Sequence, residues 1–128
     1  MQTTKRAQYA LRAMIVLAKS TEIQSLRSIA EEEGISFDYL EKIFSKLEKG
    51  GLIKAKRGAA GGYFLSRLPE KITLKDIFDA VEEPIFVVDC IEKKCPRDNT
   101  CKASKAWKKI NKAIKKSLSS VTLFDLIK

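Results

Sequence analysis

Apolar residues recur at helical spacing through the first part of the chain. Residues 4–19 place apolar side chains three and four positions apart, with basic residues between them, which predicts an amphipathic helix. Ser25 and Gly34 bound a second helix, over 26–33, because serine caps helix N-termini and glycine favours their C-terminal ends. A third helix is predicted to follow after only a short turn.

The third helix is predicted over residues 37–49. Ser36 caps it and Gly50-Gly51 ends it. With the preceding helix it forms a helix-turn-helix pattern, although an ordinary helical hairpin has the same spacing. Its apolar stripe consists of Phe37, Leu40, Ile43, Phe44 and Leu47.

A short hairpin is predicted next. Residues 52–56 alternate apolar and basic side chains, residues 57–62 form a glycine-rich turn, and residues 63–65 return as a second strand. Three helices followed by a two-stranded ribbon is the order of a winged helix-turn-helix, so we predict a mainly α fold with a small β-wing. The turn lacks the glycine spacings of nucleotide-binding loops and lies between two strands, so we expect no nucleotide site there.

The second half of the chain predicts two further helices. Thr73 and Asp76 have the spacing of a capping box, and Pro84 is expected to close the helix that they begin. From about residue 101 to 120 a long helix runs without glycine or proline, for about 30 Å. Thr122 is expected to cap a short final turn.

The long helix carries an apolar stripe that a domain of this size can hardly cover. We therefore predict that it packs against a second copy of the chain, although packing back on its own domain is the alternative. The chain then divides into a DNA-binding winged domain at 1–68, a connecting helix and cysteine-bearing sensor loop at 69–101, and a dimerisation helix and tail at 102–128. The predicted dimer contacts are Trp107, Ile110, Ile114 and Leu118.

Charge is unevenly distributed in this +9 chain. Residues 1–65 carry 11 basic and 7 acidic side chains, residues 66–101 carry 6 and 8, and residues 102–128 carry 8 and 1. A basic balance fits a polyanionic partner such as DNA. We find neither a bilayer-spanning apolar run nor a signal-peptide pattern, which predicts a soluble, cytoplasmic protein without a membrane partner. The chain contains no histidine, which excludes histidine-dependent catalysis, and we expect no enzyme activity.

The outward face of the third helix and the glycine turn are the predicted DNA-contacting surfaces. Glu41 can accept a hydrogen bond from cytosine, and Lys42 can donate to guanine or phosphate. Arg57 at the ribbon tip is suited to a narrow minor groove, where glycine permits close backbone approach. The predicted DNA-binding residues are Ser36, Asp38, Tyr39, Glu41, Lys42, Lys46, Arg57 and Gly58.

All three cysteines lie within twelve residues, as Cys90, Cys95 and Cys101. The surrounding basic side chains favour thiolates, and three thiolates without histidine suit an iron–sulfur cluster or zinc. Three ligands leave one coordination position open, as a labile sensor centre would need. Free thiols or a structural zinc site are the alternatives.

Together these motifs resemble the IscR family of bacterial transcription regulators, named for the iron–sulfur cluster regulator. The matching segments are QYAL at 8–11, ISFDYLEKIF at 35–44, LEKGGL at 47–52, RGAAGGY at 57–63, the three cysteines, Ala106-Trp107 and Val121-Thr122-Leu123. The resemblance implies a homodimeric winged-helix regulator, usually a repressor, of a near-palindromic operator. It also implies that the cysteines hold the cluster, that Glu41 tunes operator class, and that Arg57 enters the minor groove.

The family pattern leaves the fourth cluster ligand open. Ser104 stands where the best-known member has a ligand histidine, and Gln8 stands where a nitric-oxide-sensing branch has a ligand aspartate. We expect a 2Fe-2S cluster in preference to 4Fe-4S, and target genes of iron–sulfur assembly or stress. One alternative is a regulator of the same fold that senses thiol oxidation, zinc or cysteine metabolism without a cluster. Another is a small metal-binding electron-transfer or interaction protein.

Overall fold

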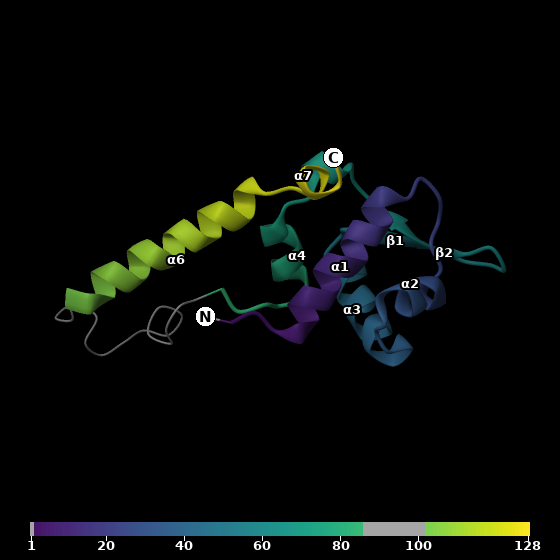
Figure 1. The fold of residues 1–128 in the computed structure, drawn as a ribbon, viewed down its shortest axis with the longest axis horizontal. Coiled ribbons are helices and arrows are strands. Elements are labelled where there is room, and N and C mark those ends of the chain that lie inside the picture. Colours follow the sequence, from purple (N-terminus) through teal and green to yellow (C-terminus); the bar gives the residue numbers. More distant parts are fainter. Residues whose placement is uncertain (1, 86–101) are drawn as a thin grey trace.

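The computed structural model describes residues 2–85 and 102–128 as a helical body from which a wing and one long helix project (Figure 1). It confirms the predicted mainly α, winged helix-turn-helix fold with a long C-terminal helix. The elements are α1 (Lys5–Lys19), α2 (Leu26–Glu33), α3 (Phe37–Lys49), β1 (Ile53–Lys56), β2 (Gly62–Leu65), the 3-10 helix η1 (Pro69–Lys71), α4 (Leu74–Ala80), α6 (Lys102–Ser120) and α7 (Leu123–Ile127).

Local capping sets the boundaries of α2 and α3. The Ser25 hydroxyl accepts a hydrogen bond from the Ser28 backbone N–H at 3.1 Å, and Ser36 caps α3 in the same way through Tyr39. Gly34 ends α2 in the left-handed conformation, at φ +66°. These caps lie where the sequence predicts them, because each is satisfied by residues within one helical turn.

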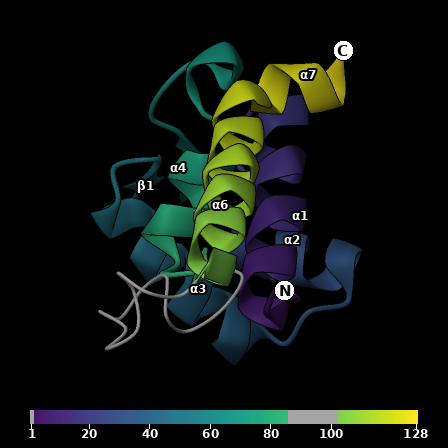
Figure 2. The same cartoon turned by 90° about the vertical axis from the view of Figure 1, so that its left-hand side faces the viewer.

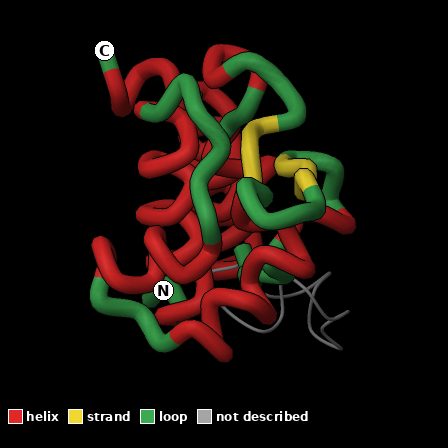
Figure 3. The backbone as a smooth tube through the Cα atoms, turned by 90° about the vertical axis from the view of Figure 1, so that its right-hand side faces the viewer, coloured by secondary structure: helices red, strands yellow, loops and turns green. Residues whose placement is uncertain are grey.

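The core lies where α1, α2 and α3 meet, and it is dominated by aliphatic side chains. Phe44 is fully buried and receives the Tyr63 ring edge-on, with ring centroids 4.8 Å apart. Burying one such side chain stabilises the fold by about 1.5–3 kcal/mol. Because Tyr63 belongs to β2, this contact ties the wing to α3. Figure 3 shows the two strands, in yellow, at the edge of the helical body.

The wing is also anchored to the loop between α1 and α2. Its strands pair antiparallel from Ile53 opposite Leu65 to Lys56 opposite Gly62. Gln24 forms an isolated bridge with Tyr63, whose N–H donates to the Gln24 carbonyl at 2.8 Å. The base of the wing is therefore fixed by backbone pairing on both sides of β2.

Replacing Gly62 with alanine is expected to destabilise the fold by about 1–3 kcal/mol, because an added Cβ would lie 2.3 Å from the Gln24 carbonyl oxygen. Urea unfolding followed by circular dichroism measures the change. Gly34→Ala measures backbone strain alone, since its Cβ meets nothing within 4 Å, and its left-handed φ should cost about 1–2 kcal/mol. Equal midpoints for Gly62→Ala and wild type would contradict this close packing.

Helix α4 begins as predicted but ends earlier. Thr73 and Asp76 form the capping box, with reciprocal hydrogen bonds of 3.0 and 3.1 Å. The prediction that Pro84 closes this helix is wrong, since α4 ends at Ala80. The reason is that Glu82 adopts a left-handed φ of +59°, which α-helical hydrogen bonding does not accommodate.

The C-terminal end of α6 is fastened to the body, and the rest of the helix extends away from it (Figures 1 and 2). The Val121 carbonyl accepts from Leu74 N–H at 3.0 Å, and the Leu123 N–H donates to the Ile72 carbonyl at 2.9 Å. Leu123 is fully buried, which seats α7 against the core. Within residues 2–85 and 102–128, no helix has the length and apolar character needed to cross a membrane.

Candidate nucleic-acid interface

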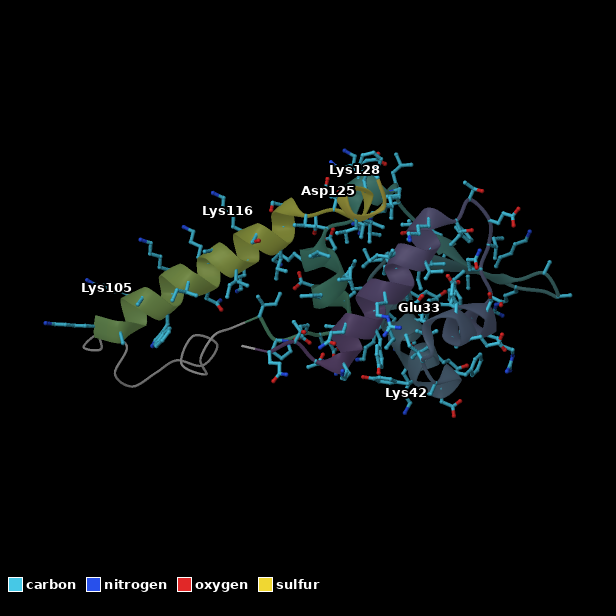
Figure 4. All side chains as sticks on the ribbon, viewed as in Figure 1. Glu33, Lys42, Lys105, Lys116, Asp125 and Lys128 are labelled. Carbon is cyan, nitrogen blue, oxygen red and sulfur yellow. The ribbon has the colours of Figure 1, made fainter. Side chains whose placement is uncertain are left out.

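Helix α3 presents one face to the core and the opposite face to solvent. Asp38, Glu41 and Lys42 are exposed, whereas Tyr39 and Lys46 are half-buried at the edges of that face. Figure 4 shows Lys42 pointing away from the body. The predicted outward residues therefore share one surface, because the buried stripe of α3 fixes the rotation of the helix. That stripe consists of Leu40, Ile43, Phe44 and Leu47.

The N-terminal end of α3 is held by α1. The Tyr39 ring meets the Tyr9 ring edge-on, with centroids 5.7 Å apart, and the Arg12 guanidinium lies 5.5 Å from the centre of Tyr9. Arg12 also forms an ion pair with Glu33 at 3.0 Å. We did not predict Tyr9 and Arg12 as site residues, because their partners lie on other helices and leave no local pattern.

Ser36 has two roles available at the start of α3. Its Oγ accepts the capping hydrogen bond from Tyr39, and it lies at the exposed N-terminal end of the helix. The hydroxyl proton can donate to a phosphate oxygen without breaking that cap. The helix N-terminus adds a favourable dipole for an anion.

The wing supplies a wholly basic surface beside α3. Residues 49–69 contain five basic side chains and no acidic one. Arg57 and Gly58 are both exposed at the turn, where Gly58 has a φ of +117° that favours glycine. Such a surface attracts a polyanion and lets its backbone come close at the turn.

Glu41 and Glu48 of α3 bring negative charge near the wing. Burial raises the pKa of the Tyr63 phenol, and the negative charges of Glu48 and Glu41 raise it further. Glu41 therefore lies near enough to the wing for its charge to act on Tyr63. An exposed carboxylate on α3 can accept a hydrogen bond from a base but repels phosphate, so it favours base contacts over phosphate contacts.

Lys46 is engaged by the segment that follows α4. Its Nζ lies 3.1 Å from the Glu82 carboxylate, and this hydrogen bond and charge lower the pKa of Glu82. The lysine side chain is 35% exposed, so it is reachable from solvent at the edge of α3. We predicted Lys46 as a phosphate contact but did not predict its partner.

The predicted metal ligands Cys90, Cys95 and Cys101 lie outside the described residues. Within 2–85 and 102–128, no cluster of three or more cysteine, aspartate or glutamate side chains could hold a metal. Gln8 donates to the carbonyl and hydroxyl of Thr3, both at 3.1 Å. Ser104 is 5% exposed on α6. Both are neutral oxygen donors, weaker metal ligands than histidine or aspartate.

The predicted dimer residues on α6 differ in exposure. Ile110 is 43% exposed, whereas Trp107 and Ile114 are half-buried. Leu118 packs against the core of its own chain. The buried positions of α6 are the polar Ser104 and Asn111. One long side of the helix is therefore covered, and Ile110 lies on the open side.

Residues 3–128 match the model of the Rrf2 family, which is described as iron-dependent transcriptional regulators. The chain belongs to the Rrf2 family. The HTH-type transcriptional regulator IscR of Xenorhabdus nematophila is 34% identical to it over 131 residues, covering 100% of this chain and 80% of that protein. The Klebsiella pneumoniae IscR is 32% identical, with 99% and 80% covered.

Solved structures of Rrf2-type regulators share the fold. CymR (YrzC), the global cysteine regulator of B. subtilis, has a TM-score of 0.81 and 38% identity, covering 99% of this chain and 96% of that one. T. potens IscR has a TM-score of 0.80 and 35% identity, covering 99% and 86%. The predicted IscR resemblance is thereby confirmed. The protein is an Rrf2-family DNA-binding transcription regulator and not an enzyme.

Proposed function

We propose that this Rrf2-family regulator binds a near-palindromic duplex operator as a cytoplasmic homodimer and represses genes of iron–sulfur assembly or stress. The observation that carries the proposal is the exposed face of α3 beside the acid-free basic wing. A helix in the major groove and a wing on the flanking minor groove need that pairing of surfaces. A two-fold dimer reads two half-sites, so the operator mirrors its symmetry.

We assign separate roles to the residues of α3 and the wing. Glu41 reads cytosine, Lys42 contacts guanine or phosphate, and Asp38 discourages binding to unsuitable sequences by its negative charge. Arg57 and Gly58 approach the minor groove. Phosphate contacts, which set register without reading sequence, come from Ser36, Tyr39 and Lys46.

The signal in this proposal is an iron–sulfur cluster held by Cys90, Cys95 and Cys101. The donor chemistry fits, since thiolates are the usual ligands of such clusters. When bound, the cluster supplies a centre that responds to iron supply and oxidants. The fourth ligand is left to a weak donor or to solvent, because Ser104 and Gln8 replace the stronger ligands of related proteins. We favour 2Fe-2S over 4Fe-4S on this donor set.

A second candidate is regulation by cysteine metabolism or thiol oxidation, without a cluster. It is favoured by the similarity to the global cysteine regulator of B. subtilis, which matches this chain as well as T. potens IscR does. The DNA-binding surface would be used in the same way. The two candidates differ in whether the thiols hold a metal, so metal analysis separates them.

The proposed DNA recognition is tested by selecting bound duplexes from a random pool with anaerobically purified protein. We expect a two-fold symmetric consensus with half-site centres about 34 Å or a multiple of it apart. Footprinting then shows whether protection extends into the minor grooves that flank each half-site. If the duplexes that remain after repeated selection share no sequence, operator recognition is contradicted.

Arg57→Ala is expected to weaken operator binding by about 1–3 kcal/mol, because it removes a guanidinium from the wing tip. A gel-shift titration at constant salt measures the change, and light scattering checks that the oligomer is unchanged. Lys105→Ala is the control, because it removes one positive charge from α6, far from the wing (Figure 4). Equal losses for the two variants would mean that net charge, and not the wing, determines affinity.

A further inference from the structure

Glu82 connects three helices at the edge of the candidate DNA-binding surface. Its carboxylate accepts a hydrogen bond from Lys46 Nζ of α3 at 3.1 Å. Its backbone carbonyl accepts from Arg6 Nη2 of α1 at 3.0 Å, and its N–H donates to the Asp79 carbonyl of α4. The residue also has a φ of +59°, which only a well-held backbone maintains in a non-glycine residue.

The backbone at this position is fixed independently of the Glu82 side chain. The neighbouring Glu83 is 5% exposed, and its carboxylate accepts hydrogen bonds from the N–H and hydroxyl of Thr4. The Glu83 N–H donates to the Phe78 carbonyl at 2.8 Å. Because these contacts hold the chain, the 73% exposed Glu82 carboxylate stays beside α3.

We propose that Glu82 is a positioning residue that competes with DNA phosphates for Lys46. This inference rests on the proposed function, in which α3 enters the major groove and Lys46 contacts phosphate. In the free protein the carboxylate neutralises the ammonium and holds it at the side of α3. On DNA, a phosphate takes the place of the carboxylate as the partner of Lys46.

The exchange is feasible because solvent reaches both partners: the Lys46 side chain is 35% exposed and the Glu82 side chain is 73% exposed. Exposed ion pairs contribute little net stability, so a phosphate can displace the carboxylate at low cost. The Glu82 charge also repels phosphates within the Debye length of about 10 Å. Since phosphate contacts are independent of sequence, Glu82 lowers the affinity for operator and unrelated DNA alike. The competition therefore limits non-specific binding to the chromosome.

Glu82→Gln tests the proposal, because it removes the charge and retains the side-chain shape and backbone contacts. We expect affinity to rise about three- to tenfold for both operator and unrelated duplex. The slope of log K against log salt should keep its wild-type value, because Lys46 contacts a phosphate in both proteins and the number of phosphate contacts sets that slope. Fluorescence anisotropy titrations between about 50 and 200 mM salt give both quantities.

Two further variants make this test specific to Lys46. Asp79→Asn removes a similar charge from α4, where Asp79 pairs with Lys75 at 2.6 Å and not with Lys46, so it should raise the affinity less than Glu82→Gln does. In a Lys46→Gln background, Glu82→Gln should raise the affinity less than it does in the wild type. An unchanged or lower affinity for Glu82→Gln, or an equal rise in affinity without Lys46, would overturn the proposal. Failure of wild type to select an operator would instead contradict the proposed function, and the unrelated duplex would still report on Glu82.

Discussion

Anaerobically purified protein is expected to contain iron and acid-labile sulfide, and to lose both when Cys90, Cys95 and Cys101 are replaced by alanine. The reason is that these are the only thiols in the chain and it has no histidine to take their place. Visible absorption should disappear with the iron. Iron and sulfide analysis beside an absorption spectrum, all without oxygen, measures the effect.

The fourth coordination position provides an internal control for this experiment. Ser104→Ala and Gln8→Ala each remove one candidate oxygen donor while keeping every thiolate. We expect both variants to retain iron, with faster loss in air for the one that supplies the ligand. A colourless wild-type protein with neither iron nor sulfide would contradict the cluster, and stoichiometric zinc would favour the cluster-free regulator.

Ile110→Glu is expected to dissociate the proposed homodimer, raising its dissociation constant about a hundredfold or more. Ile110 is 43% exposed within the protomer and is flanked on the same side of α6 by the small, exposed Ala106 and Ala113. Small neighbours let a second helix approach closely, so a charge there would be buried unpaired. A two-fold interface contains each substitution twice, which doubles the loss of association free energy. Sedimentation equilibrium measures the dimer, and gel shifts report the accompanying loss of operator binding.

A substitution at an exposed apolar residue outside α6 distinguishes loss of the dimer interface from a general effect of a new surface charge. Leu68 is 65% exposed beside η1 and does not belong to α6, so Leu68→Glu should leave the oligomer unchanged. A wild-type protein that sediments as a monomer, or an Ile110→Glu protein that remains dimeric, would exclude this face of α6 as the dimer interface. Trp107→Ala would then test the half-buried side of the same helix.

The sequence by itself determined the boundaries of α2 and α3 and the outward face of α3. Ser25, Gly34 and Ser36 act on backbone groups within one turn, so their effect is readable from spacing alone. The apolar stripe of α3 likewise determines which residues face solvent, because a helix buries its apolar side. The order of helices and strands was enough to predict the wing. Most of the candidate DNA surface, including Glu41 and Arg57, could therefore be predicted.

Only the tertiary structure decided the contacts between distant segments. Lys46 and Glu82 are 36 positions apart and Arg12 and Glu33 are 21 apart, so no local spacing pairs them. The early end of α4 has the same origin, since the left-handed Glu82 is stabilised by Arg6 of α1, which donates to its backbone carbonyl. Helical periodicity marks an apolar side of α6 but does not show that the polar Ser104 and Asn111 are its buried positions. Packing determines this, because burial depends on the neighbours that folding brings together and not on the residues of one helix.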